Sequence, residues 1–482
     1  METLNTPTTA EERLADSDIT AAVEQLFRLR KGVGANHIQV ATQAGVVLLT
    51  GFTENLLARE RAADIALAVR GVCGVVNQLE VKPPDVPDAR LQHDVNQALQ
   101  HDPAVCHYPV SCRVHSGTVT ALGTLQTWAE KRLVLNVLKG VRGVRSVADR
   151  LTFRGSEIDN TDDEITAQIR AFLDWSIRVN SALVEISTRD KVVHVSGTVG
   201  TAAEKEYVVE TAYTAGATRV DAHNLLVAAW ALSPELRRNK YAPRTDAAVA
   251  KAVHDVLRHD PRLTGFAPAV LVKNGVVTLT GSVGNLRAKR SAEQDARGVV
   301  GVWEVENQLL VPGQAPEHAA SIRQHLQEAL ARDPYVGHYT FSPEVQNGEV
   351  QLLGTVRTHF EQQHAEEVAT GIDGVTRLEN RVQVQPSNSP FAPQNFPLTG
   401  GYESTPQTVP DSTLEQRIRN HFFWCPTLHA QEIQVAVERG RATLTGTVDT
   451  WLDRKKAARD AREAGARDVN NHLRVATPGP LE

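Results

Sequence analysis

Apolar and polar residues alternate along six short stretches of the chain, and each stretch ends at a glycine. Two apolar residues always lie four and two positions before that glycine, as Val47 and Leu49 do before Gly51. Period-two alternation predicts a half-buried strand. A turn position lies six residues before each glycine, and Asn274-Gly275 suits a hairpin turn because both residues tolerate positive φ. Each stretch therefore predicts a hairpin, with structural glycines at Gly51, Gly123, Gly197, Gly281, Gly354 and Gly446.

Helical patterns flank every predicted hairpin. Before the hairpin, apolar residues recur at spacings of three and four, as in Leu91, Val95 and Leu99, which places them on one helix face. After the hairpin, alanines recur at similar spacing, for example within residues 288–296, and small side chains let a helix pack closely on a sheet. A third strand follows, for example within residues 301–309. The predicted order in each unit is helix, strand, strand, helix, strand.

This repeat sets the domain organisation. It predicts two linkers, at residues 230–244 and 386–410, and six units at residues 16–82, 89–154, 162–229, 245–312, 317–385 and 411–477. The units match best when they are three apart, which indicates that a three-unit block was duplicated. The linker 386–410 is rich in proline and polar residues, which favours an extended segment. We therefore expect the last unit to move relative to the others.

Composition and charge exclude several protein classes. The chain has 482 residues and a net charge of -6, with 51 basic and 57 acidic residues. No nucleic-acid partner is expected, because phosphate neutralisation requires clustered Lys and Arg. The four cysteines include no Cys-x-x-Cys pair, so a disulfide framework is not expected. No apolar run has the length of a signal peptide or a membrane span, which predicts a cytoplasmic protein that could bind a membrane peripherally.

Residues 275–311 and 442–475 resemble BON domains, which are named for bacterial OsmY and nodulation. The resemblance covers all six units, and units 2 and 3 depart from its pattern at Asp149, Lys191 and Ala217. It implies an α+β fold of six small αββαβ two-layer domains, each with two helices on one face of a three-stranded mixed sheet. The order of elements predicted from the hydrophobic pattern is the same. The resemblance also implies attachment to phospholipid membranes and a role in osmotic or envelope stress.

The start of the second helix in unit 6 carries the candidate lipid contact. A tryptophan suits a membrane interface, and basic residues attract anionic head groups. The alternative is that Trp451 packs over its own helix while the charges form a solvated face. The candidate lipid-binding residues are Trp451, Arg454, Lys455, Lys456 and Arg459, together with Trp128 at the equivalent position of unit 2.

Neither a metal nor a cofactor is expected. His107 lies near Cys106, Cys112 and His115, and zinc accepts thiol and imidazole ligands. However, unit 5 retains neither the two cysteines nor His115 at the corresponding positions, so the set of possible ligands is not repeated. We therefore interpret the His107-Tyr108 pair, and its equivalent in unit 5, as packing or a domain contact. The chain also lacks a phosphate loop, a dinucleotide fingerprint, a Gly-x-Ser-x-Gly elbow and a His-Glu-x-x-His motif, so we do not expect an enzyme.

The sequence leaves three functional hypotheses open. The first is a non-enzymatic, multivalent binding protein that attaches to an anionic phospholipid surface or another envelope component, because tethered weak sites raise avidity. The second is a soluble interaction scaffold or self-assembling stress protein, with protein partners or a homo-oligomeric state. The third is an ion-sensing binding module.

Overall fold

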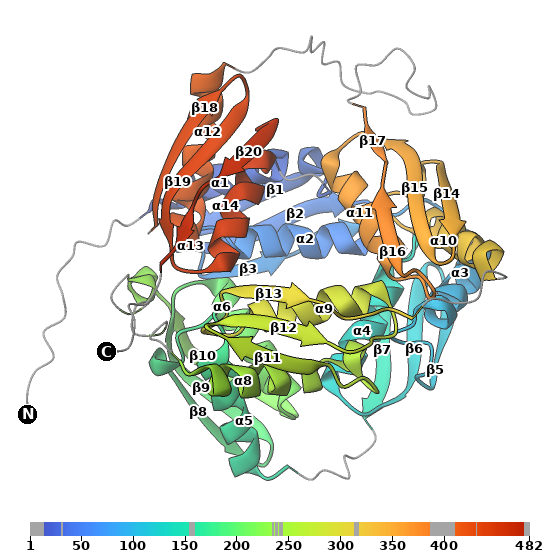
Figure 1. Ribbon diagram of the computed structural model, residues 1–482, viewed down its shortest axis with the longest axis horizontal. Helices are drawn as coiled ribbons and strands as arrows, with labels where there is room; N and C mark the ends of the chain where they lie inside the picture. Colours follow the sequence, from blue (N-terminus) through green and yellow to red (C-terminus); the bar gives the residue numbers. More distant parts are fainter. Residues whose placement is uncertain are drawn as a thin grey trace, which may run out of the picture.

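The computed structural model describes residues 14–29, 32–153, 160–233, 236, 240, 244–312, 318–385, 410–429 and 431–476. The predicted linker 386–410 lies outside the described residues except for Pro410, and the linker 230–244 is described only in part. Figure 1 shows six small αβ units gathered into one particle. No helix among the described residues has the length and apolar character needed to cross a membrane.

The first three units have the predicted order of elements. Unit 1 contains α1 (Asp16–Leu29), β1 (Ile38–Gln43), β2 (Val46–Thr53), α2 (Leu56–Leu67), β3 (Gly74–Asn77) and β4 (Glu80–Val81). Unit 2 contains α3 (Asp88–His101), β5 (Val110–His115), β6 (Thr118–Leu125), α4 (Trp128–Lys139) and β7 (Ser146–Phe153). Unit 3 contains α5 (Asp162–Trp175), β8 (Val184–Arg189), β9 (Val192–Val199), α6 (Ala202–Thr214) and β10 (Arg219–Val227), followed by the short helix η3 (Ala229–Leu232).

The last three units repeat this order. Unit 4 contains α8 (Asp246–Arg258), β11 (Ala269–Lys273), β12 (Val276–Thr280), α9 (Leu286–Arg297) and β13 (Glu304–Asn307). Unit 5 contains α10 (Ala319–Arg332), β14 (Phe341–Gln346), β15 (Glu349–Val356), α11 (His359–Thr370), β16 (Arg377–Asn380) and β17 (Gln383–Val384). Unit 6 contains α12 (Asp411–Trp424), α13 (Pro426–His429), β18 (Glu432–Glu438), β19 (Arg441–Val448), α14 (Trp451–Glu463), β20 (Asp468–Asn471) and β21 (Arg474–Val475).

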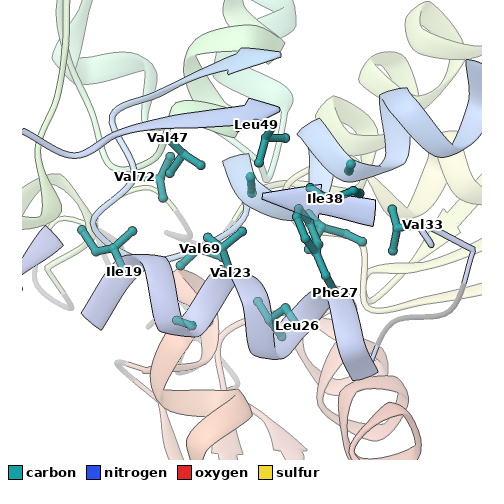
Figure 2. Packing of buried hydrophobic residues seen from close by; sticks show 14 of the residues in the cluster. Ile19, Val23, Leu26, Phe27, Val33, Ile38, Val47, Leu49, Val69 and Val72 are labelled. Atoms are coloured by element: carbon teal, nitrogen blue, oxygen red, sulfur yellow. The ribbon is translucent and has the colours of Figure 1, made fainter. Parts of the chain in front are cut away.

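The predicted fold of each unit is confirmed. The first two strands pair antiparallel and the third joins the second in parallel, as in the order β1-β2-β3 of unit 1. Val47 and Leu49 of β2 are fully buried and pack with Val23 of α1 beneath one face of the sheet (Figure 2). Similar buried clusters lie within each of the other units. Each unit is therefore a two-layer αββαβ domain with its own core.

An aspartate at the start of the first helix holds the hairpin turn. In unit 2 the turn residues Ser116 and Gly117 have φ of 50° and 73°, and both backbone amides donate to the Asp88 carboxylate, at 2.7 and 3.0 Å. These two hydrogen bonds lower the pKa of Asp88. Sequence analysis missed this contact, although an aspartate lies 29 residues before the turn position in five units. The equivalent residues are Asp16, Asp162, Asp246 and Asp411.

The glycine that ends each hairpin stretch lies close to the preceding strand. Gly446 has φ of 121°, and a Cβ atom there would lie 1.9 Å from the carbonyl oxygen of Glu432. Gly281 has a similar φ of 115°, but its nearest neighbour would be 3.8 Å away. Gly51, Gly123 and Gly197 also have positive φ and equally close backbone oxygens, whereas a Cβ at Gly354 would meet the ring of Phe341 at 2.7 Å.

A recurring main-chain hydrogen bond joins the units in pairs. The amide of Arg70 in unit 1 donates to the carbonyl oxygen of Trp424 in unit 6, at 2.9 Å. At equivalent positions, Arg142 donates to Arg332 at 2.7 Å and Val300 donates to Trp175 at 2.8 Å. The acceptor is always the last residue of a first helix, whose carbonyl has no partner within the helix. The pairs are therefore units 1 and 6, units 2 and 5, and units 3 and 4.

Other contacts close these pairs into a ring. Arg287 of unit 4 forms an ion pair with Asp102 of unit 2 at 2.7 Å, and the Tyr335 hydroxyl of unit 5 donates to the Gly32 carbonyl of unit 1 at 3.1 Å. Helix α13 of unit 6 contacts η3 of unit 3. The ring order is 1, 6, 3, 4, 2, 5 and back to 1. It alternates between the two three-unit blocks, as in a dihedral arrangement of two three-membered layers.

The second helices of the units face the interior of the particle. Within the first block, α4 contacts both α2 and α6 through the ion pairs Lys139–Glu60 and Arg132–Glu210, and α2 contacts α6 directly. In Figure 1 the sheets of units 3, 5 and 6 lie at the periphery, with α6, α11 and α14 on their inner side. The sheet faces that carry no helices therefore point outward, in different directions.

The docking of unit 6 corrects the expectation that this unit moves relative to the others. Trp424 packs against the core of unit 1, and the Arg70 guanidinium lies 5.1 Å from the ring centroid of the adjacent Phe423. The proline-rich composition of the linker 386–410 bears on the conformation of the linker itself and does not determine how unit 6 packs. The position of unit 6 is instead set by the end of α12, which the linker does not include.

Candidate functional site

Trp451, the principal predicted lipid contact, lies at a contact between units 6 and 4. The Arg297 guanidinium of unit 4 lies 4.3 Å from the indole ring centroid, and the Lys455 ammonium lies 4.2 Å from it. Burial lowers the pKa of Lys455, and the positive charge of Arg297 lowers it further. The structure thus brings Trp451 and Lys455 together, but with a cation of another unit beside them.

Arg454 and Arg459 of α14 have partners in their own unit. The Arg454 guanidinium donates to the carbonyl of Asn471 at 3.3 Å, and the Asn471 side chain donates back to the Arg454 carbonyl at 2.8 Å. Arg459 lies 3.8 Å from a carboxylate oxygen of Asp460 and 4.0 Å from one of Glu463. Lys456 is half-buried on the same helix. Opposite charges are therefore interleaved along this part of α14.

Trp128 lies at the contact between units 2 and 3. Its ring stacks on Tyr213 of α6, with the centroids 5.6 Å apart and the planes inclined by 12°. Arg132, one turn further along α4, lies 5.3 Å from the tryptophan ring centroid. The indole therefore joins two units within the first block.

The outward face of the unit 2 sheet carries unpaired arginines. Along β5 the inward residue Cys112 is buried, so Arg113 on the next position points outward. Along β7 Leu151 is buried and Arg150 points outward. Arg145 precedes β7 and is also exposed. In the part of the chain that the structure describes, none of the three guanidinium groups has an ion pair or a hydrogen bond.

Hydroxyl groups surround these arginines, and carboxylates do not. The outward positions of the three strands, all within the described residues, include no Asp or Glu. Thr118 and Ser146 share a 2.9 Å hydrogen bond across neighbouring strands, and Thr120 lies in register with Arg113. We call the set Arg113, Arg145, Arg150, Thr118, Thr120 and Ser146 the unit 2 arginine face. Sequence analysis missed it, although the alternation at residues 111, 113 and 115 could have shown which side chains point outward.

A cavity of about 380 Å³ lies where units 2, 3 and 4 meet, and it contains a pair of carboxyl groups. Burial alone raises the pKa of Asp260, but the charge of Arg262 at 2.9 Å and a 2.7 Å hydrogen bond from Ser291 outweigh it and lower the pKa. Burial, and then the negative charge of Asp260, raise the pKa of Asp295 well above its usual range. The surroundings therefore oppose ionisation of Asp295 and favour ionisation of Asp260.

The predicted histidine–tyrosine pairs pack onto their own units. The His107 and Tyr108 ring centroids lie 4.4 Å apart, those of His338 and Tyr339 lie 4.0 Å apart, and both tyrosines contact the cores of their units. Burial raises the pKa of the Cys112 thiol to about 11. The structure assembles no group of three or more metal-ligating side chains with suitable geometry within the described residues.

Comparison with known proteins follows the same division of the chain. The BON domain family model matches residues 15–83, 87–155, 161–229, 245–313, 318–386 and 410–477. Osmotically-inducible protein Y of Escherichia coli (strain K12) is 29% identical over 143 residues, which are 28% of this chain and 71% of that protein. Two structures of CdsD, a structural protein of the type III secretion system of Chlamydia trachomatis, align over 48% of this chain and at least 97% of theirs. Their identities are 18% and 15%, and both TM-scores are 0.13, so they carry no argument here. The six matches to the family model cover most of the sequence, and the chain belongs to the BON domain family.

Proposed function

We propose that this chain is a non-enzymatic, stress-related BON protein that attaches to anionic phospholipid surfaces through the unit 2 arginine face. The observation that carries this proposal is a pair of exposed guanidinium groups without ion pairs, those of Arg113 and Arg150, on a sheet face that includes no carboxylate. A third such group, that of Arg145, is exposed just before β7. The similarity to an osmotically-inducible protein supports the association with stress.

The chemistry of this face suits phosphate groups. Guanidinium groups bind phosphate oxygens through paired N–H donors, and neighbouring hydroxyls can donate further hydrogen bonds. A basic residue near an anionic membrane contributes about 1 kcal/mol, so three arginines contribute about 3 kcal/mol, or roughly 100-fold in affinity. Salt screens such contacts over about 10 Å at 0.1 M ionic strength, so binding should weaken as salt rises.

The ring of units limits how many of them a membrane can meet. Because the outward sheets point in different directions, one flat surface cannot touch all six at once. Avidity arises only from sites that can be engaged together. Attachment therefore depends on the affinity of one face, and the other units remain free for contacts away from the membrane.

The α14 residues are the second proposed lipid contact. Leu452, beside Trp451, is 46% exposed, so an apolar side chain is available at the start of this helix. Lys455 is exposed on the next turn. This contact requires lipid to compete with Arg297 for the indole ring, which the unit 2 arginine face does not require.

Co-sedimentation with vesicles tests and separates the two sites. The parent chain should sediment with vesicles of phosphatidylcholine and phosphatidylglycerol at low salt, and should remain in solution with phosphatidylcholine alone. The triple variant Arg113→Gln, Arg145→Gln, Arg150→Gln should bind roughly 100-fold more weakly. The variant Trp451→Ala, Arg454→Gln, Lys455→Gln, Lys456→Gln should bind almost as well as the parent.

A matched control removes the same charge elsewhere. Arg439, Arg441 and Arg467 lie on the outer side of unit 6, where Arg441 faces Asp468 at 3.2 Å. Their replacement by Gln should change binding less than threefold. If the parent chain fails to bind anionic vesicles, or if the unit 2 variant binds as well as this control, the proposal is wrong.

The outward face of unit 1 favours a second function, that of an interaction scaffold. Val46 and Val76 are 39% and 44% exposed on this face, and the outward positions of β1–β3 include no charged residue. Apolar sheet faces are common protein contacts. Light scattering should then show association at high concentration that Val76→Asp abolishes; a monomer at every concentration would count against this function.

A further inference from the structure

Two histidines meet at the contact between units 2 and 5. His101, in the last turn of α3, lies against His325 of α10, with ring centroids 4.1 Å apart and planes inclined by 31°. The Nδ1 atom of His101 is buried and has no hydrogen-bond partner among the described residues. If His101 became protonated, its Nδ1 atom would therefore be neither hydrated nor hydrogen-bonded to another group.

The internal repeat identifies the residues that are equivalent to this histidine pair at the other end of the contact between units 2 and 5. Units 2 and 5 are related by a shift of 231 residues, which makes Asp94 the equivalent of His325 and Arg332 the equivalent of His101. The negative charge of Asp94 acts on Arg332 there. One end of the contact thus combines opposite charges, and the other end combines two imidazoles, each of which is positive when it is protonated.

The charges around His101 favour its neutral form. Burial lowers its pKa most, and the positive charges of His325 and Arg332 lower it further, against a smaller opposite effect of Glu328 on α10. On its own helix, Asp94 forms an ion pair with Arg90 at 3.1 Å, and Asp102 forms one with Arg287 of unit 4. The carboxylates of Asp94, on α3, and of Asp102, just after it, are therefore already occupied by arginines.

We propose that the contact between units 2 and 5 is pH-sensitive, and that protonation of the His101–His325 pair in mild acid separates these two units. A histidine whose pKa is depressed in the docked state favours docking above its ordinary value of 6.5 and opposes it as the pH falls below that value. Within the described residues, neither of the other two pairs of units has two histidine rings in contact. Acid should therefore open the ring at this contact first.

The recurring main-chain hydrogen bond provides the readout. The Arg142 amide donates to Arg332 across the contact of units 2 and 5, whereas the Arg70 and Val300 amides make the same bond at the other two pairs. Hydrogen–deuterium exchange of the full chain, corrected for the intrinsic effect of pH, measures protection at all three. Between about pH 7.5 and about pH 5.5, protection at Arg142 should fall at least tenfold, while protection at Arg70 and Val300 stays within about threefold.

Two variants decide between this proposal and a general effect of acid. His101→Gln with His325→Gln should remove the pH dependence at Arg142, because neither side chain can then acquire charge. His325→Gln alone leaves one imidazole and should reduce the change by at least half, which provides a test if the double variant folds poorly. The proposal is overturned if Arg142 protection in the parent does not depend on pH, if the fall persists in the foldable variant, or if all three amides lose protection together.

Discussion

The amide of Arg142 donates a 2.7 Å hydrogen bond to the carbonyl oxygen of Arg332, which ends a helix in another unit. The last carbonyls of a helix have no partner within it, so each unit presents an unsatisfied acceptor at the end of its first helix. The loop after the second helix of a paired unit supplies the missing donor in three of the six units. Single units are thus complementary to one another, and the ring uses this complementarity repeatedly.

Removal of the Trp424 side chain should loosen unit 6. Because the indole packs on the core of unit 1 and is half-buried, Trp424→Ala should cost about 2 kcal/mol, below the usual cost for a fully buried aromatic. Calorimetry should show unit 6 melting at a lower temperature than the rest. Phe153→Ala is the control, because this ring is 47% exposed. This variant should still melt in a single calorimetric transition. Identical melting profiles for both variants would contradict the docking described here.

The carboxyl pair of unit 4 should respond asymmetrically to amide substitution. Because burial and the charge of Asp260 oppose ionisation of Asp295, Asp295→Asn should change the free energy of unfolding by less than about 1 kcal/mol. Asp260→Asn leaves the half-buried Arg262 without its ion pair to the buried Asp260 and should cost about 3 kcal/mol. Chemical denaturation at neutral pH measures both. The reverse order would indicate that the proton resides on Asp260, and equal costs would contradict the difference between the two carboxyl groups.

Unit 5 should lose stability in alkali because of a buried ion pair. Burial alone lowers the pKa of His364, but its 2.8 Å hydrogen bond to Asp333 and the Glu367 carboxylate 3.7 Å away outweigh burial and raise the pKa to about 9. A raised histidine pKa stabilises the fold fully below the ordinary value of 6.5, and this contribution disappears as the pH rises through about 9. The loss should be on the order of 3 kcal/mol.

Replacement of this histidine should flatten that dependence. His364→Gln should be less stable than the parent at about pH 6, and the difference should narrow by about pH 10. Unfolding monitored between these two pH values checks the prediction. A constant difference between parent and variant across the range would mean that His364 is not charged in the folded state.

Two of the structural glycines, Gly281 and Gly446, should differ in how well they tolerate replacement by alanine. Gly281 and Gly446 both have φ near 120°, so alanine at either position should cost roughly 1 kcal/mol in backbone strain. At Gly446 the added Cβ would also meet the Glu432 carbonyl, which should add about 1–3 kcal/mol. Denaturation midpoints of the two single variants provide the comparison. If Gly281→Ala proves the more damaging, close approach to the preceding strand does not explain the glycine.

Sequence patterns predicted the individual units better than their assembly. Alternation such as Val47 and Leu49 reports burial beneath a sheet, so strand and helix positions could be inferred for every unit. Contacts between units depend instead on single residues far apart in sequence, such as Arg70 and Trp424, which leave no periodic signal. For the same reason the sequence predicted Trp451 as a lipid contact or as packed over its own helix, and it gave no sign of Arg297 of unit 4, which lies against the indole.

Small-angle X-ray scattering of the full chain tests most directly whether the six domains form one closed particle. A compact chain of 482 residues should have a radius of gyration of about 23 Å. We expect a value near this, slightly increased by the segments outside the described residues, and a distance distribution with a single maximum. A radius above about 35 Å with separate maxima would indicate independent domains on a string and contradict the ring.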